Sequence, residues 1–286
     1  MPKLDVTRRQ FLRGLTALGV VGVAATAAYA TLVEPYAYEL TETIIHIHGL
    51  PPGFEGFRIA QVSDVHHGRL VSLEEVQRVV QLTRGAQADL IVLTGDYTTS
   101  RRHYIEPCAE VLGELQAPDG VWAVLGNHDH RTDPELTTRS LTQAHINVLN
   151  NQNTLLRRGS DVLQLAGIDD WSYNRTDWKS AFDGLDPQHP IVLLSHQPCV
   201  FDMPQTEKVA LVLAGHTHGG QVCLPIVGAP VRFMNEFHYV RGLYRRGQTQ
   251  LYVSRGTGVI GLPIRFGAPP EISVLQLRRT PEEATS

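Results

Sequence analysis

Residues 121–129 read Val-Trp-Ala-Val-Leu-Gly-Asn-His-Asp, an apolar run that stops at a glycine followed by three polar residues. A short apolar run ending in this way is typical of a buried β-strand that enters a turn. Residues 57–64 and 90–96 repeat the pattern and end in Ser-Asp and Gly-Asp. Such strands, alternating with helices, predict a parallel sheet with its polar loops gathered at the carboxyl ends of the strands.

Helices are predicted between these strands. Ser72-Leu73-Glu74-Glu75 forms a capping box that opens a helix to about Arg84, and Asp133-Pro134 begins another. Residues 104–115 are also predicted to be helical. The second half is richer in strands, which are expected over residues 163–167, 191–194, 209–214, 251–254 and 272–277, with a modest helix over 180–185. Two halves of this kind predict two packed sheets with helices outside.

Length and charge restrict the class of protein. The 286 residues carry a formal net charge of -4, which argues against a generally basic nucleic-acid binder. The three cysteines lack CxxC spacing and predict neither a disulfide framework nor a zinc knuckle. We expect residues 1–30 to be a signal or anchor, 31–56 a lead-in segment with a short strand over residues 43–48, 57–280 one folded domain and 281–286 a tail.

The chain has 13 histidines, and five of them lie in polar loops that follow apolar strands. Burying so many ionisable side chains in one place is costly unless a cation balances them. Oxygen and imidazole ligands without thiolates suit Mn, Fe or Zn. The five loops read Asp64-Val65-His66, Gly95-Asp96, Gly126-Asn127-His128-Asp129, Ser195-His196-Gln197-Pro198 and Gly215-His216-Thr217-His218-Gly219.

These motifs, in this order, resemble those of the calcineurin-like metallophosphoesterases over roughly residues 57–277. The resemblance implies a single α/β domain, a four-layer αββα sandwich, that holds two divalent metal ions. His128 is then the catalytic histidine that faces the substrate without ligating metal, and Asp129 orients it. The implied metal ligands are Asp64, His66, Asp96 and His218 for one ion, and Asp96, Asn127, His196 and His216 for the other, with Asp96 bridging.

The implied reaction is hydrolysis of a phosphodiester or pyrophosphate bond by a hydroxide that bridges the two metals. Two cations about 3.5–4 Å apart can hold the attacking and leaving oxygens, and metal binding lowers the pKa of water to about 7. One alternative is a phosphomonoesterase or nucleotidase with the same site. Another, from a different class, is a catalytically silent metal-binding protein of the cell envelope.

The substrate is less well specified by the sequence. Arg232, Arg255 and Arg265 lie in an aromatic-rich segment and are candidates for binding an anionic, partly apolar ligand, although a solvated arginine face is an equal alternative. Residues 261–272 resemble an exported or membrane-associated bacterial branch of the family. Some of its members cleave the pyrophosphate of UDP-2,3-diacylglucosamine, a lipid A precursor. That lipid is made on the cytoplasmic side, which conflicts with export.

The N-terminus has the features of an export signal. Residues 7–13 read Thr-Arg-Arg-Gln-Phe-Leu-Arg, and residues 14–33 contain no charged side chain. Paired arginines before an apolar stretch resemble a twin-arginine signal, and Ala28-Tyr29-Ala30 suits cleavage. Twenty uncharged residues are also enough to cross a bilayer, so a retained anchor is the alternative. Either way, we expect the export machinery as a partner and a location in the periplasm, in the cell wall or at the membrane surface.

Overall fold

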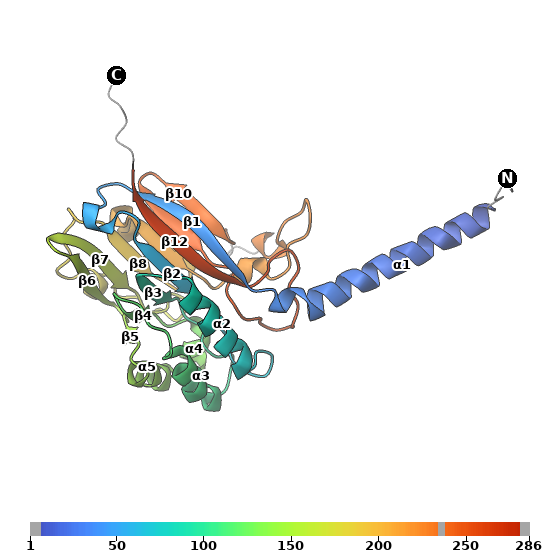
Figure 1. The fold of residues 1–286 in the computed structure, drawn as a ribbon, viewed down its shortest axis with the longest axis horizontal. Coiled ribbons are helices and arrows are strands. Elements are labelled where there is room, and N and C mark those ends of the chain that lie inside the picture. Colours follow the sequence, from blue (N-terminus) through green and yellow to red (C-terminus); the bar gives the residue numbers. More distant parts are fainter. Residues whose placement is uncertain (1–6, 234–237, 281–286) are drawn as a thin grey trace, which may run out of the picture.

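The computed structural model describes residues 7–233 and 238–280, so the predicted tail at 281–286 lies outside the described residues. Two six-stranded sheets pack face to face, and helices cover the outer face of the first sheet (Figure 1). Leu90 and Val92 of the first sheet and Leu165 and Leu213 of the second meet in the apolar core between them. The predicted α/β sandwich in a single domain is confirmed.

The first sheet is mixed, with the strand order β1-β12-β2-β3-β4-β5. Its parallel centre consists of the strands predicted from their apolar runs. β12 runs antiparallel to β2 and parallel to β1. The strands are β1 (Glu39–Ile47), β2 (Arg58–Val62), β3 (Leu90–Leu93), β4 (Val121–Ala123), β5 (Asn147–Val148) and β12 (Glu271–Arg279).

The second sheet has the strand order β10-β11-β9-β8-β7-β6. Its four central strands are parallel, and β6 and β10 pair antiparallel at the two edges. The strands are β6 (Gln152–Arg158), β7 (Asp161–Gly167), β8 (Ile191–Leu194), β9 (Leu211–Ala214), β10 (Gly242–Arg246) and β11 (Thr249–Val253).

The helices on the first sheet begin where the sequence predicts. Ser72 caps α2 (Leu73–Gly85) in a reciprocal capping box with Glu75. The Asp133 side chain accepts a hydrogen bond from the Leu136 N–H at the start of α5 (Pro134–Gln143). α3 (Ile105–Leu112) packs against both helices. Their buried apolar faces cover the sheet.

The outer layer of the second sheet is thinner. One short helix, α6 (Trp178–Ala181), and two 3-10 helices, η4 (Pro198–Asp202) and η5 (Pro204–Lys208), cover it. Proline near the start of each 3-10 helix favours a tight turn and removes a backbone donor. The other short helices are η1 (Glu34–Tyr36), η2 (Pro52–Phe54), η3 (Arg102–Tyr104), α4 (Asn127–Thr132), η6 (His218–Gly220) and η7 (Pro230–Phe233).

The segment expected to be a lead-in belongs to the sandwich. β1 pairs with β12 along its whole length, from Glu39 opposite Glu271 to Ile47 opposite Arg279. Ile45 and Ile47 are buried in the core between the sheets. The boundary predicted at residue 57 is therefore too late, because a strand of one sheet starts eighteen residues earlier, at Glu39.

The N-terminal helix α1 (Arg8–Leu32) projects away from the sandwich (Figure 1). It is long and apolar enough to cross a membrane, with a mean hydropathy of 1.7 and only 6 % of its most apolar window buried. Only its last turn touches the body: Ala30 is buried and its carbonyl accepts a hydrogen bond of 2.9 Å from the Arg265 N–H. The helix is thus an appendage, fixed to the sandwich at its base.

Candidate metal centre

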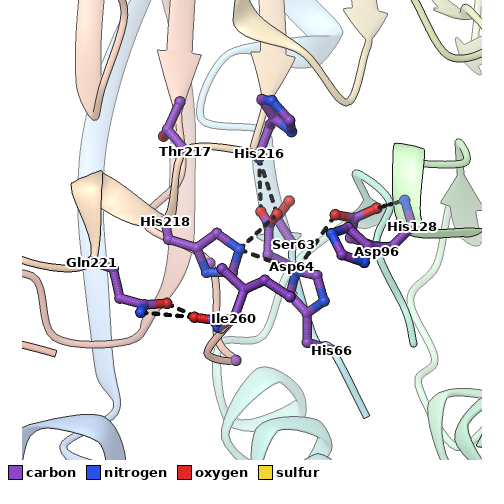
Figure 2. Close-up of polar contacts among 12 residues, drawn as sticks. Ser63, Asp64, His66, Asp96, His128, His216, Thr217, His218, Gln221 and Ile260 are labelled. Atoms are coloured by element: carbon purple, nitrogen blue, oxygen red, sulfur yellow. Dashed lines mark hydrogen bonds and ion pairs between the residues drawn. The ribbon is translucent and has the colours of Figure 1, made fainter. Parts of the chain in front are cut away.

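The polar loops after β2, β3, β4, β8 and β9 meet at one place at the carboxyl ends of these strands. Their side chains form three groups whose nitrogen and oxygen atoms lie within 4.8 Å of one another. Figure 2 shows how Asp64, His66, His218, Asp96 and His128 face one another. Parallel strands bring these loops together because their carboxyl ends share one edge of the sheet.

The first ligand set is Asp64, His66 and His218, all buried. The Nε2 atoms of His66 and His218 are 3.1 Å apart, and His218 Nε2 lies 3.5 Å from Asp64 Oδ1. Asp64 also accepts a hydrogen bond of 2.9 Å from the His216 N–H, which joins the loops after β2 and β9. These atoms converge as the ligands of a single cation would.

The second set is Asp96, His196 and His216, with Asn127 beside them. His196 Nε2 lies 3.0 Å from Asn127 Oδ1 and 3.1 Å from His216 Nδ1. An amide oxygen ligates a cation without adding charge, which suits a site that already holds carboxylates. All seven residues predicted as metal ligands are therefore brought together.

Asp96 lies between the two sets. Its Oδ2 atom is 3.4 Å from His66 Nε2 and 3.3 Å from His196 Nε2. Its Oδ1 atom accepts a hydrogen bond of 2.7 Å from the His128 N–H, so the backbone of the next loop fixes the carboxylate. One carboxylate in contact with both sets occupies the position that a bridging ligand requires.

The protonation chemistry of the site fits bound cations. His196 Nδ1 donates to the Thr94 carbonyl at 2.8 Å, which turns the Nε2 atom toward the other ligand atoms. Burial lowers the pKa of His196, but the Asp96 charge and hydrogen bond outweigh it and raise the pKa to about 10. Burial lowers the pKa of His66 to about 3 and that of His216 to about 4. The site thus favours a positive charge at its centre and neutral imidazoles around it.

The backbone is strained where the ligands lie. Five of the predicted ligands adopt left-handed conformations, which cost energy for residues other than glycine. A packed surrounding must hold such residues in place, and functional sites are where they concentrate. The φ angles are 52° for Asp64, 53° for His66, 59° for Asp96, 72° for His216 and 52° for His218.

Two glycines allow the loops to approach this closely. A Cβ atom at Gly126 would overlap the Asp96 carboxylate, and one at Gly215 would overlap Ser63 and the Asp64 carboxylate. Any larger residue at either position would push a ligand out of place. The Gly-Asn-His and Gly-His-Thr-His motifs therefore need their glycines for space.

His128 stands at the edge of the centre, with 9 % of its surface exposed and its ring edge-on to His66 at 4.8 Å. Its Nδ1 atom lies 2.9 Å from the Thr99 carbonyl and 2.6 Å from an Arg131 nitrogen. An arginine nitrogen only donates and a carbonyl oxygen only accepts, so Nδ1 accepts from Arg131 when the ring proton lies on Nε2 and donates to Thr99 when the proton lies on Nδ1. Sequence reasoning missed Arg131 and Thr99. Arg131 stands three residues after His128, the spacing of neighbours on a helix, and this was the available signal.

Asp129 does not orient the His128 ring as expected. Its buried carboxylate accepts three backbone hydrogen bonds, from Asp96 at 2.8 Å, Tyr97 at 3.0 Å and Gly126 at 2.9 Å. Burial and the nearby Asp96 charge raise the pKa of Asp129 to about 7. Asp129 therefore ties the loop after β3 to the loop after β4, and the groups next to the His128 ring nitrogen are Arg131 and the Thr99 carbonyl.

The arginines expected to bind substrate have other partners. Arg265 is fully buried and donates to four backbone carbonyls, those of Arg255, Gly256, Gly258 and Ala268. Arg255 forms ion pairs of 2.7 Å with Glu271 and 2.8 Å with Glu39. Both guanidinium groups are thus engaged within the fold. The turns after β11 leave carbonyls without strand partners, and Arg265 satisfies them. The Arg232 side chain lies outside the described residues.

Comparison with known proteins agrees with this centre. The family model described as "Calcineurin-like phosphoesterase" matches residues 57–220. The metallophosphoesterase YkuE of Bacillus subtilis is 35 % identical over 283 residues, covering 96 % of this chain and 99 % of that protein. The phosphodiesterase YaeI of Escherichia coli is 29 % identical over 95 % of this chain and 99 % of its own length. A "Transmembrane protein with metallophosphoesterase domain" of Bos taurus is 31 % identical over 97 % of this chain and 65 % of that protein. The chain belongs to the calcineurin-like phosphoesterase family and is a metal-dependent hydrolase of phosphoester bonds.

Proposed function

We propose that the protein hydrolyses a phosphodiester or pyrophosphate bond of a lipid or another component of the cell envelope. UDP-2,3-diacylglucosamine is one compound of this class. The observation that carries the proposal is the Asp96 carboxylate, placed 3.3–3.4 Å from imidazoles of two separate ligand sets. A phosphodiesterase among the relatives, YaeI, supports the preference for a diester.

The residues of the centre have two roles: seven would bind metal ions, and His128 acts on the substrate. Asp64, His66, Asp96 and His218 would hold one metal ion, and Asp96, Asn127, His196 and His216 the other. Bound ions of this kind lower the pKa of water and neutralise the charge of the phosphoryl oxygens. In the tautomer with the ring proton on Nε2, on the side away from Arg131, His128 donates a hydrogen bond to the leaving oxygen and stabilises the charge that develops there. Arg131 favours this tautomer by donating to Nδ1.

Nitrophenyl esters test the proposal. The full chain, in detergent and stripped of metal, would be given Mn, Zn or Fe together with bis-4-nitrophenyl phosphate or 4-nitrophenyl phosphate. We expect metal-dependent turnover with the diester cleaved faster. Faster cleavage of the monoester would favour a phosphomonoesterase or nucleotidase, and no turnover of either ester would favour a silent metal-binding protein. His145→Asn, an exposed histidine outside the centre, is the control variant and should behave as wild type.

We further propose that α1 directs the chain to the twin-arginine export machinery and then remains as its membrane anchor. The last turn of α1 supports retention, because Ala30 is buried and bonded to Arg265. The double variant Arg8→Lys, Arg9→Lys should stay in the cytoplasm, whereas wild type should fractionate with the membrane on the outer side. Recovery of a chain that starts at Thr31 would show cleavage instead.

A further inference from the structure

The surface loops beside the base of α1 carry a cluster of exposed apolar side chains. We propose that this cluster, named here the apolar rim and formed by Leu224, Ile226, Val227 and Leu262, dips into the same lipid bilayer that α1 enters. The bilayer contact would hold the metal centre against the membrane surface and so select substrates that are presented there. The inference rests on the proposed retention of α1 as an anchor.

The exposure of the rim has no explanation within the fold. The side chain of Ile226 is fully exposed at the tip of its loop, and Leu262 is 63 % and Val227 56 % exposed. Ile226 also has a φ angle of 70°, a left-handed conformation that is unfavourable for a β-branched residue. Neither burial nor backbone geometry therefore favours isoleucine here. Apolar side chains gathered at loop tips are expected where a protein meets a membrane or a partner.

The rim is continuous with the base of α1 through hydrogen bonds of the backbone and of one side chain. The Arg265 N–H donates to the Ala30 carbonyl in the last turn of the helix, at 2.9 Å. The next residue, Phe266, accepts from Cys223 at the start of the loop that carries Ile226. The Gln221 side chain donates to the Leu262 carbonyl at 3.2 Å. Both loops of the rim are thus fastened to the point where α1 leaves the body (Figure 1).

The length of α1 places the membrane boundary at this point. Its uncharged stretch of residues 14–33 spans about 30 Å as a helix, which matches the hydrocarbon core of a bilayer. The stretch ends at Leu32 and Val33, which are 71 % and 51 % exposed, and Glu34 follows as a buried residue of the body. No flexible linker separates helix and body, so a bilayer that holds α1 reaches the neighbouring loops. This adjacency favours a bilayer over a protein partner.

The rim loops also form one wall of the metal centre. Gly258 donates a hydrogen bond of 2.7 Å to the Asp64 carbonyl, and the loop continues from there to Leu262. On the other side, Gln221 follows the ligand His218 by three residues and bonds to Ile260 (Figure 2). A rim seated in the bilayer would therefore bring the centre to the level of lipid head groups. The substrate class that fits is a phosphodiester or pyrophosphate with a lipid tail.

Tryptophan fluorescence tests the contact. The full-length Ile226→Trp variant would be reconstituted into phosphatidylethanolamine–phosphatidylglycerol vesicles with or without brominated acyl chains. Leu155→Trp is the matched control, because Leu155 is also exposed, at 41 %, but lies on β6 at the end of the molecule away from α1. The native tryptophans are subtracted using wild type. We expect brominated lipid to remove most of the added emission of Trp at 226, with a blue shift, and to leave that of the control unchanged.

The other outcomes overturn the proposal. Quenching of the Ile226→Trp emission by aqueous acrylamide to the same extent as in Leu155→Trp would show a solvated loop. Protection from both acrylamide and brominated lipid would show that protein, such as a second copy of the chain, covers the rim. Leu262→Trp repeats the measurement if Ile226→Trp does not fold. Turnover of bis-4-nitrophenyl phosphate in detergent tests the proposed function separately, since rim residues are not metal ligands.

Discussion

At the scale of single residues, Asp96 has the most demanding position in the molecule. Its two oxygens serve both ligand sets and the His128 backbone N–H, and its own backbone is left-handed. Burial would raise the pKa of Asp96, but the charge and hydrogen bond of His196 hold it well below its usual value. The carboxylate therefore remains charged in the interior, which is the form that a ligand between two cations requires.

Replacing Asp96 by Asn should abolish turnover of bis-4-nitrophenyl phosphate and reduce bound metal. Asparagine keeps an oxygen for the His128 N–H, but its amide nitrogen cannot bridge two cations. Metal ions supply several kcal/mol of transition-state stabilisation, so we expect a loss of at least about a thousandfold. Metal content by mass spectrometry and turnover would be measured together. Asp183→Asn, at an exposed position, is the control, and unchanged metal content with full activity in Asp96→Asn would contradict the bridging role.

His128→Asn should have a different signature. Because His128 is assigned a role toward the leaving oxygen and not as a metal ligand, we expect kcat to fall by about 10²–10⁴-fold while metal content stays near two ions per chain. The control is His145→Asn, measured by the same two assays. If His128→Asn lost a metal ion, the residue would be a ligand. The contacts of His128 with His66 and Asp96 make this a real alternative.

At the scale of elements, Glu271 at the start of β12 joins the two sheets. Its carboxylate accepts hydrogen bonds from Thr41 on β1 at 2.6 Å and from Tyr252 on β11, across the core. Its other oxygen accepts from Arg255 Nε at 2.7 Å. Burial alone would raise the pKa of Glu271, but Arg255 and the two hydroxyl groups lower it. The charged form is therefore the one that the fold stabilises.

Glu271→Gln should destabilise the protein at neutral pH by about 2–3 kcal/mol, because the amide nitrogen would face the Arg255 donors and charge-assisted hydrogen bonds are lost. The folded-state pKa lies below the unfolded value of about 4.3, so the contribution is complete above that value. It disappears as the pH falls through the folded-state pKa. Urea unfolding of wild type and variant from pH 7 downward would measure it. A difference that stays constant to the lowest pH would contradict this account.

The elements predicted from sequence were those with long apolar runs. The central strands and α2 follow from such patterns and from a capping box, and their bounds differ from the prediction by only a few residues. β5, β6 and β10 were not predicted. β6 (Gln152–Arg158) is polar and half-exposed, so its strand conformation comes from pairing with β7 and not from its own apolar pattern.

At the scale of the whole molecule, the metal centre lies where loops of the first sheet meet loops of the second. Metal ions bound there should therefore contribute to the stability of the fold. Removing the ions would leave buried carboxylates and imidazoles without compensating charge. At a metal concentration of about 100 Kd, binding contributes about 2.7 kcal/mol, equivalent to about 5–10 °C in Tm for a chain of this size. Chelation should lower the Tm by that amount, and added metal should restore it.

The control for this measurement is Asp96→Asn, whose Tm should respond little to the chelator because its site is already impaired. A wild-type Tm that stays unchanged after metal content has fallen to near zero would show that the loops are held by protein contacts alone. The backbone hydrogen bonds to Asp129 and Arg265 are the contacts that could do so.

The sequence by itself determined which side chains are available to bind metal ions and hydrolyse phosphoesters. Ligand types, their order and the glycines between them are local features, and each follows a buried strand whose apolar run is visible in the chain. The roles of Asp129, Arg255 and Arg265 were decided only by the tertiary structure. A carboxylate or guanidinium can face solvent, substrate or backbone with the same sequence, and the choice depends on which groups distant strands bring near it. The full extent of β1 was also decided by the tertiary structure, because a strand was predicted only over residues 43–48, whereas β12, more than two hundred residues later, pairs with the chain from Glu39 to Ile47.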